Sequence, residues 1–319
     1  MIINPLVSII IPNYNHSRFL EERINSILNQ TYRNFELIIL DDKSTDNSLD
    51  VISQFKDNPH ISHIVVNEKN SGSTFKQWYK GLSLAKGELI WIAESDDSCK
   101  ESFLEKNVEN LVVNPECVLS FSCSRRMDMT GKIGEKIQAS LFDKDIIMDG
   151  DRFNQKYMYR GTAIINASAV VFRRNAGMLI NTIYTNYKSG GDRVFWMEVA
   201  KQGQVHLISE PLNYFRSHGD NTTSRYFQDG TSFFEAKNTY DFIKNNYGVS
   251  LYQALLIKSY YIDQIRKRRF ANEEIKNQLL HCWSPNFLID CYLFIISFRN
   301  HCFNKVCCFL MRSVHSLLL

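Results

Sequence analysis

Two short hydrophobic segments of this chain each lead directly into a group of carboxylates. The segments with their acids are 35–40 with Asp41 and Asp42, and 88–93 with Glu94, Asp96 and Asp97. In open α/β sheets, ligands bind at the carboxyl ends of the strands, where these acids would lie. A divalent cation that carries a phosphate-bearing substrate would neutralise their negative charge. The pattern therefore predicts an enzyme that handles a nucleotide.

The composition predicts a globular protein of one large domain or two modest ones, because the chain has 319 residues and 22% of them are charged. A formal net charge of +3 is too small to indicate nucleic acid as a partner. The basic run 266–269 indicates either a membrane-surface or nucleic-acid patch, or a solvated helix end. The eight cysteines include no CxxC pair, which favours reduced thiols in a cytoplasmic enzyme. Residues 1–11 are predicted to form a strand and not a signal peptide.

Hydrophobic periodicity predicts alternating strands and helices over residues 1–123. Strands are predicted at 6–11, 35–40, 61–66, 88–93 and 117–122, and helices around 19–28 and at 46–56, 73–85 and 102–113. This alternation is typical of βαβ units with a parallel sheet. Asp46 is the expected N-cap of the helix at 46–56. Residues 124–165 have no clear periodicity, and the pattern is helical from about residue 230.

The C-terminal segment is rich in apolar and aromatic residues. Its longest apolar stretch, 287–298, is too short to cross a bilayer as a helix, which needs about 20 residues. Arg299, Lys305 and Arg312 interrupt the apolar residues, as in helices that lie at a membrane interface. Helices packed against the rest of the protein or a partner subunit are the alternative.

Six motifs, in this order, resemble those of the inverting glycosyltransferases of family 2, which have the GT-A fold. They are VSIIIPNYN at 7–15, ELIILDDKSTDNS at 36–48, KNSGS at 69–73, GELIWIAESDD at 87–97, GGDRVFW at 190–196 and YFRSHGDNTT at 214–223. The resemblance implies an α/β GT-A domain, with a Rossmann-like, mostly parallel sheet flanked by helices.

The implied domain organisation has two parts. A GT-A domain would span 1–225, with a nucleotide-binding half at 1–123 and an acceptor-binding half at 124–225. A helical region at 226–319 would follow, associated with a membrane surface or a partner.

The resemblance also implies which residues bind the nucleotide: Pro12, Tyr14, Asp42 and Asp96. Pro12 closes the first strand, and the ring of Tyr14 suits stacking on a pyrimidine. An ionised Asp42 would accept the N3–H of uracil or thymine, a charge-assisted hydrogen bond worth about 1.5–3 kcal/mol. This favours uridine or thymidine over cytidine. The alternatives are a strand-to-helix turn around Tyr14 and a helix cap at Asp42.

The sequence Glu94-Ser95-Asp96-Asp97 resembles the DxD-type element of the family, in which many members have aspartate at the first position. The implied cofactor is Mg²⁺ or Mn²⁺, held by Asp97. Asp96 would hold the ribose or a metal-bound water. His218, on a loop that closes over the donor, would complete the metal site. The alternative is a helix N-cap for residues 100–113.

Asp192 is the implied general base, because inversion by single displacement needs a carboxylate beside the acceptor hydroxyl. Such a base contributes about 10²–10⁴-fold to the rate. Most related motifs have Glu-Asp here, whereas this chain has Gly191 before Asp192. Simple N-capping of a helix by Asp192 is the alternative. Arg216 could pair with the diphosphate. In the helix after KNSGS, many relatives have Arg-Asn where this chain has Gln77-Trp78, so no phosphate-binding role is carried over to that pair.

We expect a hexosyltransferase that moves a sugar from a UDP- or dTDP-linked donor to a hydroxyl of a glycan or lipid-linked glycan. By family analogy, its setting would be bacterial cell-envelope polysaccharide assembly, in the cytoplasm or at the inner face of the membrane. A sugar-nucleotide nucleotidylyltransferase is one alternative, but its glycine-rich loop is absent from PNYNHSRF at 12–19. A non-catalytic nucleotide-sugar-binding protein is the other, although such a protein would be expected to lose some of these acids.

Overall fold

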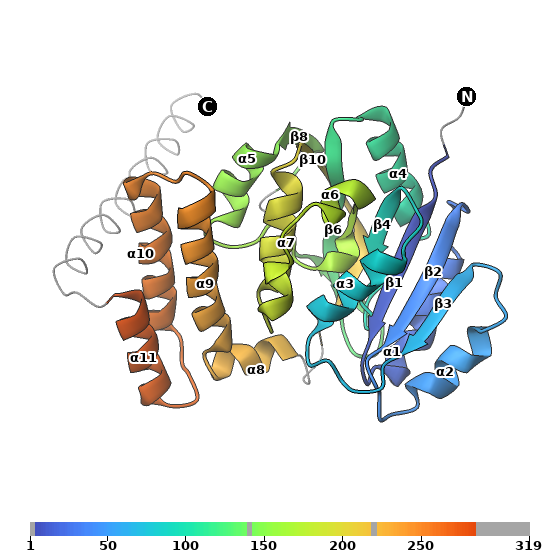
Figure 1. The fold of residues 1–319 in the computed structure, drawn as a ribbon, viewed down its shortest axis with the longest axis horizontal. Coiled ribbons are helices and arrows are strands. Elements are labelled where there is room, and N and C mark those ends of the chain that lie inside the picture. The colour runs from blue at the N-terminus through green and yellow to red at the C-terminus, as the bar shows by residue number, and fades with distance from the viewer. Residues whose placement is uncertain (1–3, 139–141, 218–221, 285–319) are drawn as a thin grey trace, which may run out of the picture. The chain divides into compact units, whose positions relative to one another are not determined.

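The computed structural model describes residues 4–138, 142–217 and 222–284 (Figure 1). The chain forms two compact units, Met1–Asn221 and Thr222–Leu319. The first contains the sheet and the acids singled out above, and the second is helical.

The first unit is built on a ten-stranded mixed sheet. Its strands are β1 (Val7–Asn13), β2 (Phe35–Asp41), β3 (Ile61–Val66), β4 (Leu89–Ile92), β5 (Ser98–Cys99), β6 (Cys117–Met127), β7 (Ile133–Lys136), β8 (Ile146–Asp149), β9 (Val170–Arg173) and β10 (Gln204–Arg216). The order is β3-β2-β1-β4-β9-β6-β10-β5, with β7 beside β6 and β8 beside β10. The first four strands in this order are parallel, which confirms the predicted parallel sheet.

Helices cover both faces of the parallel strands (Figure 1). They are α1 (Ser17–Leu28), α2 (Ser48–Phe55), α3 (Thr74–Leu84) and α4 (Phe103–Val113). All residues of β1 and β2 are buried, as expected of strands covered on both faces. Ile9 and Ile11 pack in one core with residues of α1, α2 and α4. Ile10 points the opposite way, toward α3, where a Cβ on Gly81 would lie 2.4 Å from its Cγ2, so this helix packs closely on the sheet.

The segment 124–165 and the residues that follow it contribute irregular elements and the antiparallel strand that splits the sheet. After β8 come α5 (Gly150–Phe153), a π-helical turn (Asn154–Met158), a 3₁₀ turn (Ala167–Ala169), β9, α6 (Arg174–Met178), a second 3₁₀ turn (Thr182–Asn186) and α7 (Gly191–Ala200). Strand β9 pairs antiparallel with both β4 and β6. The fifth predicted strand, 117–122, therefore belongs to β6 but does not extend the parallel block.

The second unit contains α8 (Thr222–Gln228), α9 (Thr231–Asn246), α10 (Leu251–Lys267) and α11 (Glu273–Trp283). Trp283 is fully buried, stacks on Tyr261 at 4.7 Å between ring centroids, and donates its indole N–H to the Phe233 carbonyl. Ser250 and Gln253 form a capping box that starts α10. In the described part of the chain, no helix is long and apolar enough to span a membrane. The apolar stretch 287–298 and the basic residues after it lie outside the described residues.

Candidate active site

The two acidic groups lie at the same edge of the sheet, on the two strands that flank β1. Asp41 is the last residue of β2 and pairs with Asn13 at the end of β1. On the other side of β1, Ile92 ends β4, and Glu94 to Asp97 follow it. Because all three strands are parallel, their carboxyl ends meet, and the acids gather at the edge where α/β sheets bind ligands.

Asp41 orders the loop after β2. It is fully buried and accepts hydrogen bonds from the Ser44 amide at 2.8 Å, the Ser44 hydroxyl at 2.6 Å and Asn13 Nδ2 at 2.8 Å. The same loop is joined to the one after β1, because the Thr45 amide donates to Asn15 Oδ1 at 2.7 Å. The prediction that Pro12 closes the first strand is wrong by one residue, because β1 continues to Asn13; Tyr14 comes next and is 45% exposed. Tyr14 is thus an exposed aromatic residue directly after the carboxyl end of β1.

Asp42 is held by the segment that leads into α3. Its Oδ1 accepts from Asn67 Nδ2 at 2.6 Å, the Ser71 amide at 2.9 Å and Gln77 Nε2 at 3.0 Å. Its Oδ2 accepts only the Ser71 hydroxyl, at 2.7 Å, among the described residues. A carboxylate oxygen has two lone pairs. Asp42 therefore keeps acceptor capacity on Oδ2, and it does not cap a helix.

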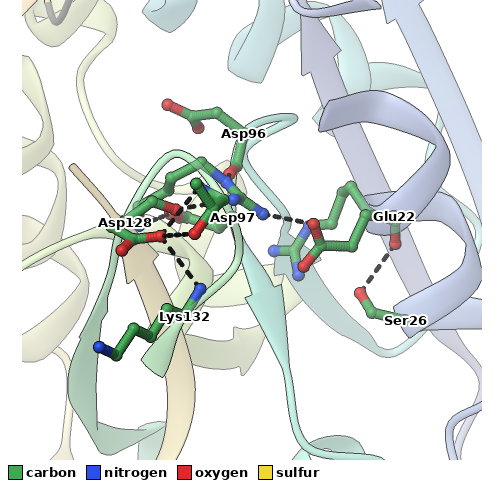
Figure 2. Close-up of polar contacts among 9 residues, drawn as sticks. Glu22, Ser26, Asp96, Asp97, Asp128 and Lys132 are labelled. Carbon is green, nitrogen blue, oxygen red and sulfur yellow. Dashed lines mark hydrogen bonds and ion pairs between the residues drawn. The ribbon is translucent and has the colours of Figure 1, made fainter. Parts of the chain in front are cut away.

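Asp97 is the most buried of the three acids in the cluster after β4 (Glu94, Asp96 and Asp97), and only 1% of this residue is exposed. Its Oδ2 accepts hydrogen bonds from Asn166 Nδ2 and from the Ser168 hydroxyl, and its Oδ1 accepts the Arg216 amide at 2.9 Å. Three of its roughly four lone pairs are thus used by the protein. The carboxylate of Asp96 points away from Asp97 and is partly exposed (Figure 2).

Arg216 ties the acidic loop to its surroundings. Its guanidinium donates to the carbonyls of Asp96 at 2.7 Å and Asp128 at 2.9 Å, and to the carboxylate of Glu22 at 2.5 Å (Figure 2). It also lies over the ring of Phe19, at 4.6 Å from the centroid. With 1% of its side chain exposed, Arg216 braces the loop. Three of its five guanidinium N–H groups donate to protein acceptors, so Arg216 has a structural role here, and its pairing with a diphosphate stays a prediction.

Glu94 accepts the indole N–H of Trp78 at 2.9 Å, and its own amide donates to the Ser168 hydroxyl. Burial raises the pKa of Glu94 to about 8, and the carboxylate of Asp96 adds to this rise, while the Trp78 hydrogen bond opposes it. Burial, with Asp96 beside it, also raises the pKa of Asp97. Burial and mutual repulsion thus favour the protonated forms of these acids, and a bound cation would favour the charged carboxylates.

A buried guanidinium lies close to this cluster. Arg23 of α1 is fully buried, and its guanidinium carbon lies 5.0 Å from the Trp91 ring centroid. Its positive charge opposes the rise in the pKa of both Glu94 and Asp97. None of its guanidinium nitrogens has a hydrogen-bond partner among the residues that the structure describes. The sequence held a signal for it: Arg23 lies midway between Phe19 and Ile27 on the apolar face of α1.

Asp192 lies in the first turn of α7 and is half-buried. The residue before it, Gly191, is pressed against α3 and the preceding 3₁₀ turn. A Cβ on Gly191 would lie 2.6 Å from the Tyr184 carbonyl oxygen and 2.7 Å from the Phe75 ring. The departure from the common Glu-Asp pair thus has a steric reason, because no side chain fits at 191 in this packing.

The comparisons with known proteins agree with this architecture. The model of the family described as Glycosyl transferase family 2 matches residues 8–176, more than half of the chain. The chain belongs to glycosyl transferase family 2. This confirms the family predicted from the six motifs, and the protein is a glycosyltransferase.

Individual relatives agree with this assignment. The glycosyltransferase is 36% identical over 213 residues to a putative teichuronic acid biosynthesis glycosyltransferase, TuaG, of Bacillus subtilis, covering 66% of this chain and 79% of the relative. Among solved structures, S. aureus TarS 1–349 in complex with UDP-GlcNAc has a TM-score of 0.66 at 16% identity, covering 87% of this chain and 80% of that one. A mannosyltransferase from Pyrobaculum calidifontis, in complex with GDP-Man and Mn²⁺, has a TM-score of 0.56 at 15% identity, covering 93% and 80%. These structural likenesses confirm the GT-A fold.

The acids of the glycosyltransferase fit a divalent cation that is shared with a substrate. Among the described residues, no group of three His, Cys, Asp or Glu side chains could hold a metal without help. Mg²⁺ and Mn²⁺ in nucleotide sites usually take one or two carboxylates and complete their shell with phosphate oxygens and water. Asp97, with its remaining lone pair, would be the carboxylate ligand of such an ion, and Asp96, whose carboxylate points outward, would hold the ribose or a metal-bound water. His218 lies outside the described residues.

Sequence reasoning missed the side chains that hold the acids. Asn166 and Ser168 support Asp97 from about 70 residues away in the sequence, through hydrogen bonds that also reach Asn213 and the Glu94 amide. The available signal was weak: two polar residues directly before the apolar strand β9. Such a pair is common in loops, so only the fold identifies its role.

Proposed function

We propose that this glycosyltransferase transfers a sugar, with inversion at the anomeric carbon, from a UDP- or dTDP-linked donor to a hydroxyl of a glycan or lipid-linked glycan. The observation that carries the proposal is the convergence of Asp42 and the Glu94–Asp97 loop at the carboxyl ends of the two strands flanking β1. A single donor molecule bound across the end of β1 would have its base beside Asp42 on one side and its diphosphate beside the Glu94–Asp97 loop on the other.

Recognition of the base is assigned to Asp42 and Tyr14, beside Pro12. The free lone pair of Asp42 Oδ2 would accept the N3–H of uracil or thymine, and the exposed Tyr14 ring would stack on the base. Cytosine presents a lone pair at N3, so it would face the carboxylate with repulsion. The UDP-GlcNAc bound to TarS supports a uridine donor for this chain.

The diphosphate is assigned to a divalent cation held by Asp97. A Mg²⁺ or Mn²⁺ ion held there would neutralise the charge that develops on the leaving diphosphate. Asn166, Ser168 and the Arg216 amide keep Asp97 in a fixed orientation, so little reorganisation is needed when the donor binds. Asp96 would orient the ribose or a metal-bound water. The Mn²⁺ in the mannosyltransferase complex supports a divalent cofactor.

Asp192 is proposed as the general base. It would take the proton from the acceptor hydroxyl while that oxygen attacks the anomeric carbon from the side opposite the diphosphate, which inverts the configuration. The steric restriction at Gly191 leaves the adjacent position without a second carboxylate. The proton therefore passes to Asp192 alone.

Replacing Asp192 by Asn tests this role directly. We expect Asp192→Asn to bind UDP with Mn²⁺ as tightly as the wild type and to lose about 10²–10⁴-fold in transfer rate, because only the proton acceptor is removed. Calorimetric UDP titration and single-turnover transfer assays measure the two quantities. Unchanged turnover would remove Asp192 from the mechanism.

A panel of nucleotide sugars tests the donor class. We expect release of UDP or dTDP, dependent on Mg²⁺ or Mn²⁺, to exceed release of CDP and GDP. A preference for GDP-mannose would contradict the role of Asp42, because guanine presents a different edge. Pyrophosphate release from a nucleoside triphosphate and a sugar phosphate would instead indicate a nucleotidylyltransferase.

The acceptor side is proposed to lie at the inner face of the cytoplasmic membrane, in polysaccharide assembly. All four side chains of the basic run 266–269, at the end of α10, are exposed, which suits contact with anionic lipid headgroups. We expect the protein to cosediment with phosphatidylglycerol-containing vesicles at low salt and not with phosphatidylcholine vesicles. Equal sedimentation with both would contradict an electrostatic membrane contact.

A further inference from the structure

Two departures from the common family pattern contact each other in this chain. In the resemblance described above, many family members have aspartate at the place of Glu94 and Arg-Asn at the place of Gln77-Trp78 in α3. The indole Nε1–H of Trp78 donates to Glu94 Oε1 at 2.9 Å. The extra methylene of glutamate lengthens the side chain that makes this contact.

Trp78 is fixed in place by the core around it. It is 1% exposed and packs edge-on against Phe75 of its own helix and Phe195 of α7, with ring centroids 5.2 and 5.5 Å apart. Trp196, also on α7, lies 5.9 Å away. Because Trp78 is enclosed by α7, its N–H direction is set by the same helix whose first turn carries Asp192.

The neighbouring residue of α3 does the same for the other acidic group. Gln77 Nε2 donates to Asp42 Oδ1 at 3.0 Å. Consecutive residues of one helix thus reach the acid after β2 and the acid after β4. An additional hydrogen bond joins Glu94 to the support of Asp97, because the Ser168 hydroxyl accepts from the Glu94 amide and donates to Asp97 Oδ2.

We propose that Trp78 is a positioning residue for the donor: its indole N–H holds the Glu94 carboxylate in the orientation that the bound nucleotide sugar requires, and its ring links that carboxylate to the helix of Asp192. The inference rests on the proposed function and adds a specific role for the Gln77-Trp78 pair. Loss of the N–H would free the carboxylate to rotate beside Asp96 and Asp97.

The first experiment compares Trp78→Phe with Trp196→Phe. Both changes shrink an indole to a phenyl ring in the same aromatic cluster, but the Trp196 N–H has no hydrogen-bond partner among the described residues. We expect Trp78→Phe to lower kcat/KM for the donor about tenfold, and Trp196→Phe to change it less than about twofold at a similar loss of thermal stability. Equal kinetic losses in both variants would overturn the proposal, because they would reflect packing alone.

The second experiment repeats the change in a Glu94→Asp background. The shorter side chain should lose contact with the indole, so Trp78→Phe should then have no further effect on kcat/KM beyond about twofold. A full tenfold loss in that background would show that Trp78 acts by another route. This arm also decides the question if Trp78→Phe alone folds poorly, because Glu94→Asp should by itself lower kcat/KM for the donor.

A third measurement tests the contact between Trp78 and Glu94 without depending on which nucleotide sugar is the donor. The chain has four tryptophans, so their indole N–H signals can be assigned by NMR. In Glu94→Asp we expect the Trp78 indole proton to exchange faster with solvent, with the Trp91 and Trp283 protons unchanged, since those donate to the Ser168 and Phe233 carbonyls. If no UDP or dTDP sugar is turned over, the donor proposal fails, yet this exchange result still shows whether the contact exists. Unchanged Trp78 exchange would overturn the contact itself.

Discussion

Individual side chains at this site are oriented by the protein before any ligand binds. Asp97 has three internal donors and Asp42 has four, so neither carboxylate is free to rotate. Their binding geometry is thus established during folding, which is the main requirement for electrostatic stabilisation of a developing charge. The buried guanidinium of Arg23 provides part of the balancing positive charge.

Gly191 gives a prediction at the same scale. Gly191→Ala places a Cβ against the Tyr184 carbonyl and the Phe75 ring, and overpacking of this kind costs about 1–3 kcal/mol of unfolding free energy. Because α7 must move to relieve it, Asp192 moves too, and we expect kcat to fall together with Tm. Differential scanning calorimetry and transfer assays measure both.

The matched control is Gly161→Ala, where an added Cβ meets no atom within 4 Å. It should leave both Tm and kcat close to those of the wild type. If Gly191→Ala behaved like this control, the steric explanation for the missing second acid would be wrong.

At the scale of elements, the carboxylate of Asp46 connects the amino ends of α1 and α2. Asp46 Oδ2 accepts the Ser17 amide at the start of α1, at 2.9 Å, and Asp46 Oδ1 accepts the Ser48 amide at the start of α2, at 3.0 Å. The N-cap of α2 is Asn47 and not Asp46 as predicted, because the helix begins at Ser48, but the Asp46 side chain accepts from the first amides of both helices. Both loops carry predicted nucleotide-binding residues, Tyr14 before α1 and Asp42 before α2.

The pKa of Asp46 predicts that the stability of the protein depends on pH. Burial alone would raise its pKa, but hydrogen bonds from Ser48 and Ser17 outweigh that effect and lower it. A carboxylate whose pKa is lower in the folded state stabilises the protein above its unfolded pKa of about 4 and loses that contribution as the pH falls below it.

We therefore expect Asp46→Asn to lower the unfolding free energy by about 1 kcal/mol at pH 7, the usual cost of losing a cap. The difference from the wild type should shrink as the pH falls from about 4 toward 2. Urea titrations at several pH values measure it. A difference that stays constant across this range would show that the charge of Asp46 contributes nothing.

At the scale of the whole molecule, each of the two units has buried apolar residues of its own among the described residues. The sheet core of the first unit contains the buried strands β1, β2 and β4, and the core of the second unit is centred on Trp283. All the described acids assigned to catalysis and donor binding belong to the first unit. A nucleotide should therefore stabilise that unit by mass action.

At a concentration of UDP and Mn²⁺ about 100-fold above Kd, this linkage amounts to about 2.7 kcal/mol. For a domain of this size it corresponds to a rise in Tm of roughly 5–10 °C. We expect UDP with Mn²⁺ to give this shift in calorimetry, and EDTA to reduce it strongly. A shift that persists in EDTA would argue against a divalent ion between Asp97 and the diphosphate.

The sequence by itself determined the parallel strands, the helices between them and the placement of acids at strand ends. Each of these depends on a local pattern of apolar residues: β2, for example, is a short, fully buried and mostly apolar run that ends at Asp41. The order of the six motifs then identified the family, because each motif is a contiguous string whose identity needs no knowledge of long-range contacts.

Only the tertiary structure decided how those acids are held. The partners of Asp97 come from the segment before β9, the partner of Glu94 comes from α3, and the constraint on Gly191 comes from Phe75 and Tyr184. Strand β9, which enters antiparallel between β4 and β6, brings the first of these into place. Contacts between residues so far apart in the chain leave no pattern in the local sequence. They depend on which helices and strands pack together, whereas a local pattern indicates only whether a segment is a helix or a strand.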